Sequence, residues 1–508
     1  MFWPTLAALL VRQTAALPTM AHPTIVAVAV GYFAVVAAIA TWAARRTRTA
    51  GEFFVAGRGI GLWALTLSAM AATLSGFIFI GGPGLFYSVG LGALYIMLSA
   101  SITGAMGAWV LAKRLRLLGE LRGLISIPDA IGVRYRSRLA QGLAAVAILI
   151  AIVGYTATNF LALGLVIDAV FDIGTGPAIW LGMAIILAYS ATGGILAGIY
   201  ADVFQGALMA LAAVLVFLAA MQVGGGMEEI SRTIVASDPT FLGPWGKMTP
   251  LAALSLFFVF GIGSLGQPHV IHKFYMLKDP RRLKWYPLLM TLSILLTMLL
   301  LFGVGVTMKA LVIGGDVAPL TAPDQATPTF LLRFAPTFLA GIVLAGAVAA
   351  IMSTVNSFLS VGAAALTHDI PVALGREPRQ LLRAGRLYTV LISVAAALLA
   401  QLSDTLVAFL GIFGFGLFAS TLVPALAIGL NWPGATREGA IASIVVGIVT
   451  TLVFESLAYF RLYTFPVGVT ISGLSLVLSF LAFFVVSWLT SRGEGARIDE
   501  DVLLVLES

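Results

Sequence analysis

The sequence contains no cysteine and little charge. Only 10% of its 508 residues are charged, whereas 60% are hydrophobic, and a soluble domain usually carries roughly 25% charged residues. The absence of cysteine excludes disulfide bonds and thiolate metal sites. The chain also lacks a Walker-type phosphate-binding motif, which argues against ATP as its energy source. A chain of this composition would expose too many hydrophobic side chains if water were its only solvent, so we expect most of it to lie in a lipid bilayer.

Apolar runs of about 20 residues, the length that an α-helix needs to cross a bilayer, recur along almost the whole chain. They predict an all-α polytopic membrane protein with thirteen spans, short loops and one membrane-embedded domain. The predicted spans are residues 24–43, 59–90, 91–112, 140–168, 175–193, 203–222, 250–272, 287–313, 335–363, 387–403, 406–429, 439–459 and 466–488. Only a tight turn at Ser403 and Asp404 separates two of these spans.

The basic residues are distributed unevenly between the predicted loops. With the N-terminus outside the cell, 23 of the 29 lysines and arginines fall on the cytoplasmic side, Lys273 among them. Such a bias follows the positive-inside rule, and it explains the net charge of +7 without a nucleic-acid partner. It predicts a multi-pass protein with its C-terminus in the cytoplasm. The first 23 residues lack the pattern of a cleaved signal peptide.

Two of the predicted spans contain clusters of helix-breaking residues. The second span has glycine and proline at Gly76 and in 81–84, and the seventh has them in 261–268. Each interrupted span is the first of a group of five spans, which occupy residues 59–222 and 250–429. Because five is an odd number, the two groups have opposite topology in the membrane. This arrangement predicts an inverted repeat whose interrupted helices bind ion and solute near mid-membrane. Glycines that only allow close helix packing are the alternative.

The ninth span contains four polar residues within positions 353–357. Two of them, Ser353 and Thr354, share one helix face with Ala350, because these positions are three and four residues apart. Polar groups at membrane depth are costly unless they face partners. One interpretation is a Ser/Thr contact between helices. The other is that both hydroxyls and the Ala350 carbonyl meet the unwound second span around a cation.

Five motifs follow one another along the chain. They are FFVAGR at 53–58, FIGGPG at 79–84, YSATGGILA at 189–197 followed by Ala201, Asp202 and Gln205, GQPH at 266–269 and AAIMST at 349–354. In this order they resemble the motifs of the sodium:solute symporters, a family that includes bacterial proline and pantothenate carriers. The resemblance covers roughly 51–488. It implies a leucine-transporter-type fold, with a ten-helix core in 51–430 and peripheral helices in 1–50 and 431–508.

The resemblance also implies where sodium, the expected coupling ion, binds. Carried onto this sequence, the family's sodium site consists of the carbonyls of Ala71, Leu74 and Ala350 and the hydroxyls of Ser353 and Thr354. Asp202 matches the acid that follows the family signature, so we expect it on the ion pathway. A charge that stabilises a helix N-terminus is an equally good interpretation of Asp202.

The implied solute pocket lies on the two interrupted helices and the fourth span. Its expected residues are Ser75, Gly76, Tyr155, Phe260, Ser264 and Gln267. The chain departs from the proline carriers at two positions, since they have Asp where Thr73 stands and Trp where Phe260 stands. His269 lies within a family motif, which favours a structural role, although His269 and His272 together also resemble a proton switch.

These features predict a secondary-active symporter of the bacterial inner membrane that works by alternating access. Its solute is expected to be an amino acid such as proline, or a carboxylate such as pantothenate. A proton-coupled symporter of the same fold and a solute sensor without transport are the alternatives. An enzyme is disfavoured, because the few intramembrane acids and the isolated histidines predict no nucleophile–base pair and no metal cluster. The expected partners are the solute and the lipid bilayer, without nucleic acid, and the sequence leaves the oligomeric state open, a monomer included.

Overall fold

The computed structural model describes residues 22–45, 54–377, 380–402, 407–493, 495 and 497–507. This part of the chain is helical, with one isolated β-bridge between Ile60 and Leu277. Its α-helices are α2 (Pro23–Ala44), α4 (Leu62–Thr73), α5 (Gly82–Val89), α6 (Leu94–Gly107), α7 (Lys113–Arg122), α8 (Ile127–Arg134), α9 (Arg138–Phe171), α10 (Thr175–Val223), α11 (Met227–Ser237), α12 (Pro250–Gly263), α13 (Pro268–Ile271), α14 (Tyr286–Gly314), α15 (Ala326–Arg333), α16 (Thr337–Ala364), α17 (Ile370–Ala373), α18 (Leu381–Leu402), α19 (Val407–Leu422), α20 (Arg437–Tyr459), α21 (Ile471–Leu489) and α22 (Glu500–Glu507).

The apolar helices agree with the predicted spans. Within the described ranges, ten segments are long and apolar enough to cross a membrane, and three shorter apolar helices accompany them. One boundary is wrong: the predicted spans 175–193 and 203–222 both lie in α10, which is helical throughout. The residues between them include Ile, Leu and Ala and no proline, so helix propensity does not enforce a break. The predicted turn at Ser403 and Asp404 lies outside the described residues.

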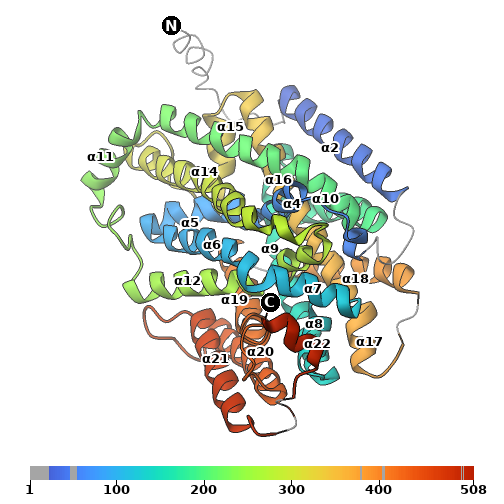
Figure 1. Ribbon diagram of the computed structural model, residues 1–508. Helices are drawn as coiled ribbons and strands as arrows, with labels where there is room; N and C mark the ends of the chain where they lie inside the picture. The colour runs from blue at the N-terminus through green and yellow to red at the C-terminus, as the bar shows by residue number, and fades with distance from the viewer. Residues whose placement is uncertain are drawn as a thin grey trace.

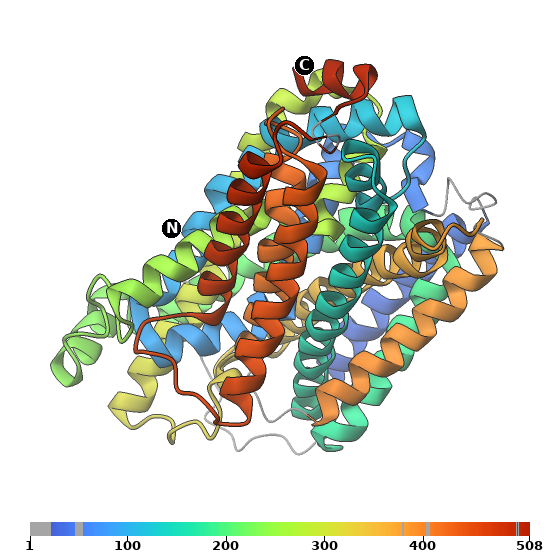
Figure 2. The ribbon, with the colours of Figure 1, turned by 90° about the horizontal axis from the view of Figure 1, so that it is seen from below.

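The helices form a bundle in which α9, α16 and α19 lie near the middle (Figure 1). Residues on all sides of α9 and α16 are buried, whereas α20 buries a single stripe that is rich in small side chains. Small residues let two helices approach closely, and α20 packs along α21 at the edge of the bundle (Figure 2). The centre of the bundle is therefore where polar side chains must find partners.

The two interrupted spans break in the same way. Helix α4 ends at Thr73, and Leu74 has the extended angles φ −86° and ψ 94°. Helix α12 and the turn Ser264–Gly266 end at Gln267, which has φ −76° and ψ 98° before α13 begins. One extended residue releases carbonyls of the preceding turn from their helical hydrogen bonds. The matching geometry supports the inverted repeat that the sequence predicts.

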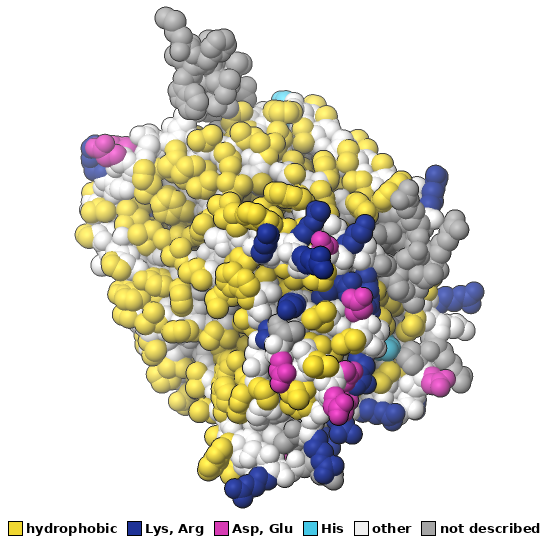
Figure 3. All heavy atoms as spheres, viewed as in Figure 1, with side chains coloured by type: hydrophobic (Ala, Val, Ile, Leu, Met, Phe, Trp, Pro, Cys, Tyr) yellow, Lys and Arg dark blue, Asp and Glu magenta, His cyan; other side chains and the backbone are white. Residues whose placement is uncertain are grey.

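On the face shown in Figure 3, charged side chains gather in the centre and lower right, over α7, α8 and α22, and hydrophobic side chains cover most of the left and upper parts. Helix α22 is attached to this face through Arg122, whose guanidinium lies 2.5 Å from Asp501 and 3.0 Å from Asp499. Arg114 adds a bond of 3.1 Å to the carbonyl of Leu506. The charged face thus carries a folded C-terminal segment.

Candidate functional site

Thr354, one of the positions predicted to bind the cation, contacts the end of α4 where this helix breaks. Thr354 Oγ1 lies 3.0 Å from the carbonyl oxygen of Ala72 and 3.5 Å from that of Leu74. Ser353 Oγ is buried and has no hydrogen-bond partner among the described residues. The predicted ligands are all at most 1% exposed, and they are Ala71, Leu74, Ala350, Ser353 and Thr354. This region therefore combines hydroxyl and carbonyl oxygens out of contact with water, the groups that a hard cation can use.

The first polar solute-site candidates lie directly after this break. Ser75 Oγ is 3.5 Å from Tyr155 Oη and accepts a hydrogen bond of 3.2 Å from the backbone N–H of Phe77. The Tyr155 ring packs against Phe358 of α16, with the ring centroids 5.0 Å apart. The structure thus brings Ser75 and Tyr155 together, from two elements that are 80 residues apart.

Gly76 occupies the tightest position of the site. Its N–H donates a 2.9 Å hydrogen bond to Asn159 Oδ1 of α9. A Cβ at this position would lie 2.7 Å from Ala162 Cβ and 3.1 Å from Ile351 Cγ1, so only glycine permits this approach of three elements. Asn159 was not among the predicted site residues. Its signal was a polar amide in the middle of the predicted fourth span.

Phe260 forms an aromatic wall beside these groups. Its ring stacks on Phe415 of α19 at 4.3 Å and on Phe77 at 5.9 Å, measured between centroids. Phe77 follows Gly76 directly, so the wall lies next to the start of the second helical half. Offset aromatic stacking of this kind gives a rigid apolar surface.

Ser264 and Gln267 lie along the second interrupted span. Ser264 Oγ is directed toward α6, 3.1 Å from Thr103 Oγ1, and it is also 2.8 Å from the carbonyl of Gly261. Gln267 donates from Nε2 to the carbonyl of Gly263 at 3.2 Å, while its buried Oε1 has no partner within the part of the chain that the structure covers. Gln267 thus retains an acceptor for a ligand, whereas Ser264 already has protein partners.

The two histidines and Thr73 are used structurally. The His269 ring packs against Phe358 of α16, with the ring centroids 4.1 Å apart. His272 Nε2 lies 2.9 Å from the carbonyl of Ile125. Thr73 donates from Oγ1 to the carbonyl of Ala69, in its own helix.

Asp202 forms an ion pair inside the bundle. Its Oδ2 accepts from Ser68 Oγ at 2.5 Å and from Lys273 Nζ at 2.8 Å, and both charged side chains are 1% exposed. Lys273, which was predicted to lie in a segment between spans, is instead buried inside the bundle. The helical turn η6 (His272–Met276) continues beyond the break at Gln267 and carries Lys273 into the protein against α4.

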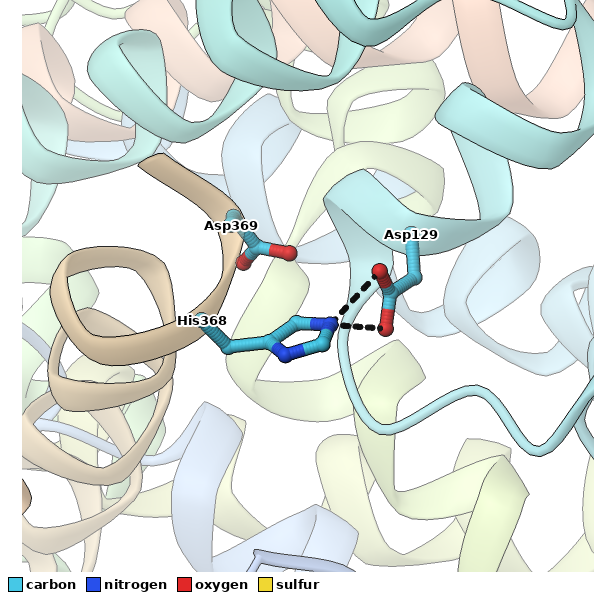
Figure 4. A group of neighbouring side chains, drawn as sticks. All are labelled: Asp129, His368 and Asp369. Atoms are coloured by element: carbon cyan, nitrogen blue, oxygen red, sulfur yellow. Dashed lines mark hydrogen bonds and ion pairs between the residues drawn. The ribbon is translucent and has the colours of Figure 1, made fainter. Parts of the chain in front are cut away.

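A second polar cluster, made of Asp129, His368 and Asp369, joins α8 to the π-helical turn η9 (Ala365–Asp369) after α16 (Figure 4). His368 Nε2 points to both oxygens of Asp129, at 2.9 and 3.0 Å. Gln141 donates to Oδ1 of each aspartate, at 2.7 and 3.1 Å, and Ser126 donates to Asp369 Oδ1 at 2.6 Å. The expectation of isolated histidines is therefore wrong for His368, whose partner Asp129 lies 239 residues away in sequence.

These three side chains offer ligand atoms within 4.8 Å of one another, of the types that divalent transition metals accept. However, protein donors already bond both oxygens of Asp129 and one oxygen of Asp369. The cluster is thus largely satisfied by the protein itself, and its evident effect is to hold α8 against the end of α16.

Comparison with known proteins relates this arrangement to characterised transporters. The chain is 29% identical to the osmoregulated proline transporter OpuE of Bacillus subtilis (strain 168), over 91% of this chain and 94% of that protein. It is also 29% identical to the sodium/pantothenate symporter of Escherichia coli (strain K12), over 90% and 94%. The substrate-bound, outward-open structure of a Na⁺-coupled sialic acid symporter has the same fold, with a TM-score of 0.72 and 20% identity over 93% of this chain and 98% of that one.

The family model of the sodium:solute symporters matches residues 53–447. This range includes both interrupted spans, the Thr354 region of α16 and the Asp202–Lys273 pair. It thereby covers most of the chain and every candidate site residue described above. The chain belongs to the sodium:solute symporter family, and it is accordingly a sodium-coupled solute transporter and not an enzyme.

Proposed function

We propose that this transporter imports a small solute that has a carboxylate and an apolar body, an amino acid such as proline or an acid such as pantothenate. Its relatives include a proline transporter and a sodium/pantothenate symporter. We further propose that sodium binds at the break of α4, through Ala71, Leu74, Ala350, Ser353 and Thr354. The observation that carries the proposal is the position of Thr354 Oγ1, 3.0 Å from the carbonyl of Ala72 in the last turn of α4, directly before the break.

The proposed solute position lies between the aromatic wall and the start of the helical half at Gly76. The N-terminal end of a half-helix is electropositive and attracts a carboxylate. The hydroxyls of Ser75 and Tyr155 are adjacent to this end and can donate hydrogen bonds. The stacked rings of Phe77 and Phe260 suit the apolar body of the solute. The site thus provides one polar and one apolar side for a small acid.

Sodium entry supplies enough free energy to drive accumulation. One positive charge that crosses a membrane potential of 100 mV gains about 2.3 kcal/mol. Since about 1.4 kcal/mol corresponds to a factor of ten, this drives roughly fiftyfold accumulation of a neutral or zwitterionic solute before the sodium gradient is added. For such a solute, a single ion at the break of α4 therefore suffices for concentrative import.

Uptake into proteoliposomes tests this proposal. Labelled proline and labelled pantothenate are offered with and without an inward sodium gradient, while a protonophore removes any proton gradient. The double variant Ser353→Ala/Thr354→Ala should lose sodium-stimulated uptake. Ser360→Ala is the control, because Ser360 is a buried hydroxyl of the same helix that bonds the carbonyl of Asn356.

Three outcomes would contradict parts of the proposal. Uptake that needs the proton gradient instead of sodium would establish proton coupling. Binding of either solute without flux would favour a sensor. Unchanged sodium stimulation in the double variant would refute the location of the ion.

We also propose that the N-terminus is outside and that the charged face carrying α22 is cytoplasmic. Because the chain has no cysteine, one introduced cysteine is its only thiol. Ser237 at the end of α11 and Arg282 in the turn η7 (Pro280–Trp285) are exposed and are predicted to lie on opposite sides. A membrane-impermeant maleimide applied to intact bacteria should label Ser237→Cys and spare Arg282→Cys. The reverse pattern would refute this orientation.

A further inference from the structure

The pair of Lys273 with Asp202 is not used by the proposed ion and solute sites. We propose that Lys273 is a resident cation that fills the position beside Asp202, so that the transporter binds one sodium ion per cycle and no second one there. This inference rests on the proposed sodium coupling. In this proposal, the positive charge of Lys273 beside Asp202 determines how many sodium ions are transported with each solute molecule.

The first argument is the set of oxygens around the ammonium group. Lys273 Nζ lies 2.8 Å from Asp202 Oδ2, 2.6 Å from Ser68 Oγ and 2.8 Å from the backbone carbonyl of Ser68. A carboxylate, a hydroxyl and a carbonyl are the oxygen types that also bind a free hard cation. The three N–H donors of the ammonium match these three oxygens, so Lys273 occupies a ready-made cation position.

The second argument is the environment of Asp202. Both side chains of the pair are 1% exposed, and an isolated charge in such a place would be strongly destabilising. The neighbouring amide of Gln205 is directed elsewhere, since its Nε2 donates to Tyr32 Oη at 2.7 Å. Asp202 Oδ1 has no hydrogen-bond partner in the described ranges. The negative charge of Asp202 is therefore balanced by Lys273, and without that ammonium it would attract another cation.

The third argument is the location of the pair relative to the two breaks. Ser68 precedes the break at Leu74 by six residues, and Lys273 follows the break at Gln267 by six. The β-bridge between Ile60 and Leu277 joins the same two segments nearby. The ammonium group thus comes from the second half of the repeat and its oxygens from the first, and none of these oxygens is among those that Thr354 contacts.

Counting bound sodium on the purified protein tests the inference without knowledge of the solute. The probe is ²²Na⁺ alone, in a scintillation proximity assay on the full chain. The unaltered protein should bind one sodium ion. Lys273→Gln should bind two, because Asp202 loses its cation, and Lys273→Gln/Asp202→Asn should bind one again. Lys284→Gln, which removes an exposed lysine of η7, is the matched control and should bind one.

Each result supports or overturns the inference. Two ions on the unaltered chain, or one ion on a monodisperse Lys273→Gln protein, would overturn it. If Lys273→Gln does not fold, Ser353→Ala/Thr354→Ala still decides, since it should bind no sodium while Lys273 fills the other position. Residual stoichiometric binding that disappears when Asp202→Asn is added would overturn the inference, whereas residual binding that persists would refute the proposed location of the ion at Thr354. Failure of the unaltered chain to bind any sodium would instead refute the proposed function.

Discussion

Replacing Thr354 with valine removes one oxygen from the proposed ion site and almost preserves the shape of the side chain. In the structure, Thr354 Oγ1 connects α16 with the carbonyl of Ala72 in the last turn of α4 and with that of Leu74 at the break. The side chain is 0% exposed, so water has no direct access to replace the lost hydroxyl. The substitution therefore tests the contribution of a single oxygen to sodium binding.

The expected magnitude follows from the energy of an interaction with a charged group. Such an interaction contributes about 1.5–3 kcal/mol, which corresponds to roughly a 10- to 150-fold change in an equilibrium constant. We therefore expect the sodium concentration for half-maximal uptake to rise by this factor in Thr354→Val. Thr354→Ser keeps the hydroxyl and should restore most of the affinity. Maximal uptake at saturating sodium should change much less than the affinity.

The assay is sodium-dependent uptake in proteoliposomes, with the amount of inserted protein measured for each variant. Thr389→Val is the matched control, because Thr389 is 3% exposed and its hydroxyl bonds only the carbonyl of Gly385 in its own helix in the structure as described. If Thr354→Val and Thr389→Val have the same sodium dependence as the unaltered protein, the hydroxyl does not contact the ion. The reasoning from the break of α4 would then be wrong.

Two further predictions concern packing and pH. Gly76→Ala places a methyl group 2.7 Å from Ala162 Cβ, so uptake should fall strongly. Gly59→Ala is the control and should transport normally, because its new Cβ meets nothing within 4 Å. Equal uptake by the two variants would contradict this prediction. Hydrogen bonds from Arg122 lower the pKa of Asp501 below its ordinary value of 3.8, so the docking of α22 persists at neutral pH and weakens as the pH falls through the lowered pKa. Asp501→Asn, which mimics protonation, should speed hydrogen exchange in 500–507 at pH 7, and unchanged exchange would refute this role.

Much of the fold follows from the sequence because apolar runs and helix breakers are local signals. The break at Leu74 lies between Thr73 and Gly76, and the break at Gln267 directly precedes Pro268, which cannot supply a helical N–H. By contrast, the glycines in 193–198 lie within the continuous helix α10. Glycine permits a break without enforcing one, so its position alone was insufficient there.

The parts of the site that the sequence analysis missed depend on partners far away in the chain. Asn159 matters because Gly76 presents an N–H to it, and His368 because Asp129 reaches it from α8. Neither residue belongs to a short motif of recognisable chemistry. The burial of Lys273 was missed for another reason, since lysine near the end of a span usually marks a cytoplasmic loop.

The inverted repeat nevertheless contains the information that would have placed Lys273. The two interrupted spans cross the membrane in opposite directions, so residues before the first break and residues after the second lie on the same side. Six residues of helical backbone correspond to about 9–12 Å along the axis, which puts Ser68 and Lys273 at similar depth below their breaks. A lysine at that depth requires an acid, and Asp202 follows the family signature that enters the same region. The ion pair can therefore be predicted when positions are counted from the break in each half and residues at the same distance are compared, although the sequence of either half alone does not reveal it.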